Sequence, residues 1–489
     1  MPTDHDTVIA DLRAEVRAFC EDRDWDLSVA RRPAAATVLA AAVMAVTGMG
    51  PAPTVAQDAP FHDLATELAG AYELESGRHL VIVPHPSLGL LSLFDLETGL
   101  ARPLEPVADP ASDAGEAADP AGESDTYIYG PNVTAVSPVE GRITFVRDDE
   151  GTIDHLVWTS DDGDLDGDAD GDRHIARRVP LRREPVRFTN GDEAEFAGWL
   201  ITPPTDGPHP VAVIFQPGAN DRFKMWRTAM AVAIDGIGVL VFDRRDAGES
   251  SGEPLPAHYW SASQVLAGDG AAAVRFARSH PRVDSARVGV VGWSGGGWLG
   301  ALVARRVREL AFYVNIAGNA NPGWQQNRWN KLSTMRWEGF EDEEMAEAEA
   351  FLDLHFDVMH GEATWETYGD AVEELGDRPW FQWMERTFRY LWKSEEEARE
   401  YAGLARDNEP EEDFARVSAP TLGLFFEHDE SSPPETPWIF LRGRARGPNP
   451  DVTVRVFPNT THEAFVVDEF PTEAGQSRIE RLEPALGDE

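Results

Sequence analysis

Five short runs of consecutive apolar residues are the feature that most constrains how this chain folds. A strand that reads as an unbroken apolar run is typically covered on both faces, which is the situation of strands in a parallel sheet. From residue 185 onward the chain alternates strand, loop and helix, the pattern of a mostly parallel sheet with helices on both faces. We therefore predict an α/β domain over residues 185–489, with buried strands at residues 210–215, 238–242, 287–291, 312–316 and 421–426.

The residues before this domain follow a different pattern. Between residues 61 and 160, short apolar runs recur, as at residues 79–83, 90–94 and 142–146. Segments rich in Gly and Asp separate these runs, and both residue types tolerate the positive φ angles of hairpin turns. The sequence therefore predicts a small all-β domain over residues 61–160, in which no residue indicates chemistry.

An Asp-rich segment follows, and we interpret residues 161–184 as an acidic linker. Its carboxylates twice form the Asp-x-Asp-x-Asp-Gly pattern that begins a calcium loop. Such closely spaced carboxylates are ligands that suit Ca²⁺. The twelfth position of each frame is Arg173 or Arg177 instead of the Glu that such loops use. Calcium binding therefore stays an alternative to a plain linker, with the candidate ligands Asp164, Asp166, Asp168 and Asp170.

Residues 1–60 have the composition of a leader. Arg31 and Arg32 precede a small, apolar run over residues 33–50, and residues 54–56 offer the small side chains that a signal peptidase reads. The run is shorter than a membrane-spanning helix needs, so we expect no stable membrane span after processing. These features predict a secreted or periplasmic protein. The acidic residues before Arg31 leave a cytoplasmic extension as the alternative.

Charge and cysteine content exclude several classes of partner. The chain has 86 acidic and 43 basic residues, a formal net charge of −43, so its surface repels phosphate backbones and we expect no nucleic-acid partner. Lysine occurs only at Lys224, Lys331 and Lys393, which favours salt adaptation over the alternative of an acidic protein from a GC-rich genome. The single cysteine, Cys20, excludes an internal disulfide and a thiolate zinc site, and we expect no cofactor.

Residues 292–296 read Gly-Trp-Ser-Gly-Gly and carry the clearest chemical signal. They follow the apolar run ending at residue 291 and precede a helical pattern that starts at Gly297. A strand that turns sharply into a helix needs glycines where the two backbones approach, and the turn holds the Ser with its hydroxyl exposed. Ser294 is therefore the candidate nucleophile.

At this point the sequence resembles the α/β-hydrolase superfamily, over roughly residues 185–467. Residues 243–250 look like the turn that follows an early strand in that family, with Asp246 where the family has its first Gly, and residues 281–287 are similar to the connection that enters the nucleophile strand. The likeness is to serine hydrolases of the esterase, dienelactone-hydrolase or serine-aminopeptidase kind. Residues 69–74 resemble the lipocalin-like accessory domain found with some bacterial serine hydrolases.

The resemblance implies an acid and a histidine later in the chain, each in a loop after a strand. Asp429 follows the run at residues 421–426 and is the candidate acid. Its neighbours Glu427 and Glu430 are the alternatives, with Glu427 as runner-up. His462 follows the strand pattern at residues 453–457 and is the candidate base.

The resemblance also implies an oxyanion hole of two backbone N–H groups. Gly295 supplies one by its position after the nucleophile. The loop at residues 216–220 supplies the other, and we assign it to Ala219, although the chain has Pro217 where the family usually has His.

A long insertion separates the strands ending at residue 316 and beginning at residue 421, which predicts a helical cap at about residues 318–416. Helical apolar spacing occurs at residues 343–355 and 380–401. Seven tryptophans in the insertion either favour an apolar acyl group or pack the cap on the core. We expect a small-molecule ester as substrate, with a short peptide, and hence peptidase or amidase activity, as the alternative. A non-catalytic binding protein of this fold is a further alternative, although it would be expected to have lost one of the three candidate residues.

Overall fold

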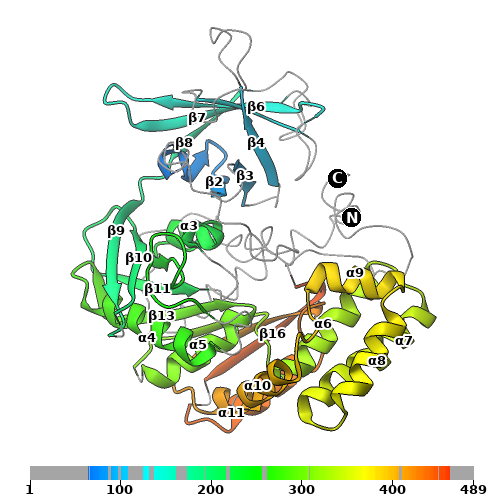
Figure 1. Cartoon of the computed structure of the whole chain (residues 1–489). Coiled ribbons are helices and arrows are strands. Elements are labelled where there is room, and N and C mark those ends of the chain that lie inside the picture. The colour runs from blue at the N-terminus through cyan, green and yellow to red at the C-terminus, as the bar shows by residue number, and fades with distance from the viewer. Residues whose placement is uncertain are drawn as a thin grey trace.

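The computed structural model of the protein contains a closed β-barrel and an eight-stranded sheet with a helical insertion (Figure 1). Several predictions fall outside the described residues: the leader at residues 1–60, Ala219, and the candidate calcium ligands Asp164, Asp166, Asp168 and Asp170. The structure describes residues 64, 66–85, 90–96, 101–107, 125–130, 137–160, 173–191, 193–215, 221–255, 262–307, 309–406, 410–449 and 451–462.

The predicted all-β domain is an antiparallel barrel in which each strand pairs with the next and β1 closes the ring by pairing with β8. Its interior is filled by large side chains such as Tyr72, Phe145 and Trp158, and the Trp158 Nε1–H donates to the Tyr129 hydroxyl over 2.6 Å. The strands are β1 (Gly70–Leu74), β2 (His79–His85), β3 (Leu90–Asp95), β4 (Ala101–Pro106), β5 (Thr126–Tyr129), β6 (Gly141–Arg147), β7 (Ile153–Ser160) and β8 (Arg173–Arg178).

The prediction of a linker over residues 161–184 is wrong for the residues of β8. Ala176 is fully buried and lies opposite both Leu74 and Leu156. A barrel leaves no unpaired edge only if a last strand pairs on both sides. The strand that closes the barrel, β8, therefore comes from a segment whose charged composition led to the prediction of a linker.

The α/β domain contains the predicted sheet, with the strand order β16-β15-β14-β13-β11-β12-β10-β9. β10 is antiparallel to both of its neighbours, and all other pairs are parallel. Each predicted apolar run forms a strand, so the predicted fold class is confirmed. The strands are β9 (Arg182–Thr189), β10 (Glu195–Thr202), β11 (His209–Phe215), β12 (Gly238–Phe242), β13 (Val283–Trp293), β14 (Tyr313–Ile316), β15 (Thr421–His428) and β16 (Val452–Thr461).

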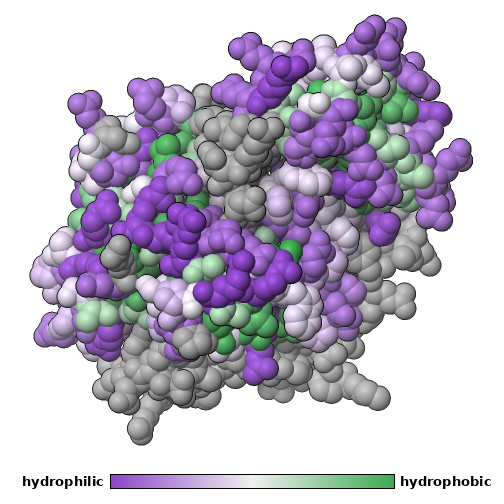
Figure 2. Space-filling view, turned by 90° about the horizontal axis from the view of Figure 1, so that it is seen from below, coloured by the Kyte–Doolittle hydropathy of each residue, from purple (hydrophilic) through white to green (hydrophobic). Residues whose placement is uncertain are grey.

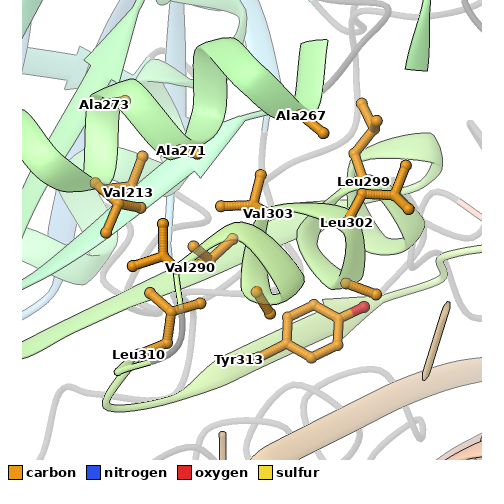
Figure 3. Close-up of a cluster of buried hydrophobic side chains, with 14 of the residues drawn as sticks. Val213, Ala267, Ala271, Ala273, Val290, Leu299, Leu302, Val303, Leu310 and Tyr313 are labelled. Atoms are coloured by element: carbon orange, nitrogen blue, oxygen red, sulfur yellow. The ribbon is translucent and has the colours of Figure 1, made fainter. Parts of the chain in front are cut away.

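Helices α4 (Ser263–Ser279), α5 (Gly295–Arg306) and α12 (Thr436–Ala445) contribute to the core on one face of the sheet. The outer surface of the molecule on this side is largely hydrophilic, with smaller hydrophobic groups between (Figure 2). Inside, Val213 and Val290 of the sheet pack with Ala271 and Val303 of the helices (Figure 3). This apolar layer packs against β13, the strand that precedes Ser294.

The other face of the sheet packs against η3 (Arg222–Met225), α3 (Trp226–Ile234) and the barrel. Val81 and Val83 point out of the barrel into this layer, whereas Leu80 and Ile82 alternate with them and point inward. The guanidinium of Arg227 in α3 lies 4.5 Å from the centre of the Phe94 ring of β3. The barrel therefore shares a core with the α/β domain.

The predicted helical cap lies between β14 and β15, and its helices share a separate aromatic core, except for the last of them, whose Phe414 packs in the core of the sheet. The helical pattern at residues 380–401 is two helices, because Arg389 adopts a left-handed conformation with φ 47° and ends the first. Among the described residues, no helix is both long and apolar enough to span a membrane. The helices are α6 (Gly323–Trp337), α7 (Asp342–His360), α8 (Trp365–Leu375), α9 (Pro379–Phe388), α10 (Glu395–Arg406) and α11 (Pro410–Ala415).

Candidate active site

Ser294 stands at the turn between β13 and α5, as the sequence predicts. Its backbone has a positive φ, with φ 56° and ψ −130°, a strained conformation for a residue with a side chain. Gly292 is required there, because a Cβ at that position would lie 2.0 Å from the Gly296 carbonyl oxygen. The turn is held by a 2.8 Å hydrogen bond from the Ser294 N–H to the Ile316 carbonyl.

The structure brings the three candidate residues into one chain of contacts. The Nε2 atom of His462 lies 3.0 Å from the Ser294 Oγ. Its Nδ1 atom lies 2.8 and 2.9 Å from the two carboxylate oxygens of Asp429. Both His462 and Asp429 are buried. An imidazole placed in this way can accept a proton from the hydroxyl while the carboxylate orients the ring.

Asp429 is held by its own loop. Its Oδ1 atom accepts hydrogen bonds from the backbone N–H groups of Ser431, over 2.8 Å, and Ser432, over 2.7 Å. Burial raises the pKa of the Asp429 carboxyl above its ordinary value, the neighbouring Glu430 carboxylate also raises it, and the contact with His462 lowers it. The carboxylate is thus fixed in direction and paired with an imidazole.

The runner-up acid, Glu427, lies elsewhere. Its carboxylate is exposed and accepts from the Asn459 N–H over 2.8 Å. Glu430, the other neighbour weighed as an alternative acid, is part of the site, although not as the acid: it is 2% exposed, and its Oε2 accepts from the His462 N–H over 3.0 Å. A buried carboxylate one position from the acid cannot be told from a loop residue without knowing the direction of its side chain.

The predicted oxyanion donors are only partly described. Gly295 is the first residue of α5, so its N–H belongs to a helix N-terminus, where the backbone favours negative charge. Ala219 lies outside the described residues. In the part of the chain that the structure describes, no group of three or more His, Cys, Asp or Glu side chains is arranged to hold a metal ion.

Part of the sequence matches a family model. The model is described as "Alpha/beta hydrolase family" and matches residues 217–474, more than half of the 489 residues. The chain belongs to the alpha/beta hydrolase family. The strand order, the turn at Ser294 and the positions of Asp429 and His462 after late strands are those expected of a member.

Curated relatives match a shorter part of this hydrolase. An uncharacterized protein of Mycobacterium tuberculosis is 34% identical over 128 residues, which are 26% of this chain and 41% of the relative. The same values hold for its counterpart in a second strain. The chain thus spans about two fifths of the length of the curated relatives it matches.

Solved structures similar to this hydrolase include an esterase from Pyrococcus furiosus, with 15% identity over 57% of this chain and 83% of that chain and a TM-score of 0.37. A proline iminopeptidase from Mycobacterium smegmatis has 22% identity over 57% and 92%, with a TM-score of 0.37. Acetyl xylan esterase 1 from Thermoanaerobacterium has 14% identity over 85% and 90%, with a TM-score of 0.34. Membership of the family rests on the sequence match and not on these likenesses.

Proposed function

We propose that this protein is a serine hydrolase that cleaves carboxylic esters of small molecules through an acyl-enzyme on Ser294. The observation that supports the proposal is the continuous contact from the Ser294 hydroxyl through His462 to the buried Asp429 carboxylate. Such a chain makes the hydroxyl nucleophilic without a metal or cofactor. A binding protein of the same fold has no need to keep all three groups in contact.

In the proposed mechanism, His462 Nε2 takes the Ser294 proton as Oγ attacks the carbonyl carbon, and the carbonyl oxygen becomes an oxyanion beside the Gly295 N–H. The imidazolium then gives its proton to the alkoxide, which leaves as the alcohol. Water, deprotonated by the same imidazole, attacks the acyl-enzyme. The imidazolium then returns the proton to the Ser294 Oγ as the acyl bond breaks, which releases the carboxylic acid and restores the hydroxyl. Asp429 keeps Nδ1 protonated and stabilises the imidazolium throughout.

Ester substrates are preferred to peptides in this proposal because alkoxides and phenoxides leave more readily than amines. Peptidase or amidase activity is the second candidate, since the same three groups serve both reactions. The acidic runs of the cap, such as those that open α7 and α10, could meet the amino group of a peptide. They are equally expected of the solvated faces of an acidic protein.

The test is hydrolysis of p-nitrophenyl esters from acetyl to dodecanoyl, at low and at molar salt, by the wild type and by Ser294→Ala. We expect the variant to lose at least about 10³-fold in kcat. Ser279→Ala is the matched control, because the Ser279 hydroxyl is exposed and bonds only its own helix, at the Phe276 carbonyl. Full activity in Ser294→Ala would disprove the nucleophile. Inactivity of the wild type on all esters but activity on aminoacyl arylamides would favour the peptidase.

A further inference from the structure

We propose that cap helix α6 and the carboxylate of Glu430 position Asp429 and His462, so that the cap contributes to the geometry of the catalytic groups. The proposal rests on the proposed function, because it concerns the same three groups. Two sets of hydrogen bonds support the proposal, and both include Glu430.

The first set joins α6 to the backbone of the acid loop. The Trp329 Nε1–H donates to the Asp429 carbonyl over 3.0 Å. Two donors, the Asn330 amide over 3.3 Å and the Ser333 hydroxyl, converge on the Glu430 carbonyl. Helix α6 therefore donates hydrogen bonds to two successive backbone carbonyls of this loop, those of Asp429 and Glu430. The first of these residues, Asp429, is the one that contacts His462.

The contact extends to both sides of these residues. The Gln326 amide of α6 donates to the Ser431 carbonyl over 2.7 Å. Asn321, just before the helix, donates to the Glu435 carboxylate over 3.0 Å and accepts from the Thr436 hydroxyl over 2.9 Å. The whole turn from β15 to α12 is therefore bonded to the cap.

The second set runs from Glu430 to the histidine loop. While its carbonyl accepts from α6, its buried carboxylate accepts from the His462 N–H. Burying a carboxylate is unfavourable unless it is hydrogen-bonded. Glu430 also places a second negative charge beside Asp429, which raises the pKa of the Asp429 carboxyl. It does fix the backbone of His462 relative to the loop of Asp429.

Because of these two sets of hydrogen bonds, the geometry of Ser294, His462 and Asp429 depends on the position of the cap relative to the sheet. The Nδ1 to carboxylate contacts of 2.8 and 2.9 Å tolerate little movement of either loop. A displacement of about 1 Å at a reacting centre can reduce a rate about 100-fold. If α6 shifted, the carbonyls of the acid loop and, through Glu430, the backbone of His462 would lose their support together.

The rival explanation is that the α6 contacts only attach the cap to the sheet. Substitutions on one helix distinguish the two. Ser333→Ala removes a donor to the acid loop, and Trp329→Phe keeps an aromatic ring but removes its N–H. Arg328→Ala is the matched control, because Arg328 binds Glu349 over 2.6 Å and Asp353 over 2.7 Å, both within the cap.

We expect Ser333→Ala and Trp329→Phe each to lower kcat about 10- to 100-fold on the best p-nitrophenyl ester, with KM within about twofold. The rate of covalent labelling by a fluorophosphonate probe should fall in parallel, since it reports the reactivity of Ser294. Arg328→Ala should leave both rates unchanged. Thermal melting of each variant verifies that it is folded.

Glu430→Gln keeps an acceptor for the His462 N–H but removes the charge. We expect the acid limb of its kcat/KM profile to move to lower pH, because the His462 cation loses a neighbouring anion. Wild-type kcat, labelling rate and pH profile in Ser333→Ala, Trp329→Phe and Glu430→Gln, with Ser294→Ala inactive, would overturn the positioning role and leave the proposed function intact. Activity in Ser294→Ala would instead remove the proposed function itself.

Discussion

The Nε2 atom of His462 lies 3.0 Å from the Oγ atom of Ser294, although 168 residues separate the two in the chain. Both residues follow strands of one sheet, Ser294 after β13 and His462 at the end of β16. Parallel strands end at the same edge, so residues that follow them meet there whatever their distance in sequence. Asp429 reaches the same edge after β15, which lies beside β16.

Asp429→Asn should lower kcat about 10³- to 10⁴-fold on any ester that the wild type hydrolyses. The introduced amide no longer holds a proton on His462 Nδ1, and the ring then presents a protonated Nε2 to Ser294. Steady-state kinetics measure the loss. Glu427→Gln, at an exposed position near the end of β15, should keep near-wild-type activity. If the two variants exchanged these behaviours, Glu427 would be the acid.

Gly248→Ala should destabilise the protein by about 2–4 kcal/mol. The residue has φ +56°, and an added Cβ would lie 2.4 Å from the Asp243 Oδ2. That buried oxygen accepts from Arg222 over 2.6 Å and from the Glu249 N–H over 2.8 Å, so it has little freedom to move. Chemical denaturation gives the change in free energy of unfolding.

Gly268→Ala provides the control for this substitution. Gly268 lies inside α4, and no heavy atom comes within 4 Å of an added Cβ. Because Ala is the better helix former, we expect a gain of about 0.5–1 kcal/mol. Equal effects of the two substitutions would contradict the argument from backbone conformation and space.

Lys331→Met should stabilise the protein at neutral pH by about 1–3 kcal/mol. Burial lowers the pKa of Lys331 from its ordinary 10.5 to about 8. Its ammonium lies 5.3 Å from the Phe388 ring centre and 5.6 Å from that of Tyr390, and donates to the side-chain Oδ1 of Asn327 over 3.2 Å. The rings offset part of the desolvation of the cation, which keeps the expected gain below that of an unassisted buried lysine.

The gain from Lys331→Met should depend on pH in one direction. A lysine whose pKa is lowered on folding destabilises the folded state below pH 8, and this penalty disappears as pH rises from 8 to 10.5. Thermal melting at pH 7, 9 and 10.5 should therefore show the advantage of the variant shrinking. Lys393→Met, at an exposed lysine, should show no such trend. A constant advantage across this range would exclude titration of Lys331 as its cause.

The melting temperature of the wild type should rise by several degrees between about 0.1 M and about 1 M KCl, because the Debye length falls from about 10 Å to about 3 Å. The reason is self-repulsion of a chain with a formal net charge of −43. KCl is preferred to sulfate, which stabilises proteins generally by exclusion from their surface. A melting temperature that is flat or falls would favour the alternative of an acidic protein without salt adaptation.

Local patterns of the chain were sufficient for much of the architecture. Unbroken apolar runs predict the central strands because a strand covered on both faces must be apolar on both. Ser294 could be predicted for a similar reason, since the glycines around it are a steric requirement of the turn. Asp429 and His462 could be placed because the resemblance to the family implies an acid and a histidine after late strands, and parallel strands end at the same edge of the sheet.

Tertiary structure alone decided what depends on contacts between distant segments. β8 is a strand because β1 and β7 need a partner, although Arg173–Arg178 has few apolar residues of its own. Glu430 joins the site because its side chain turns inward to the His462 N–H. The bonds from Trp329 and Ser333 to the acid loop follow from the docking of α6. A sequence states which residues can fill a strand or a sharp turn, whereas the direction of a polar side chain is set by the donors and acceptors that folding brings to it.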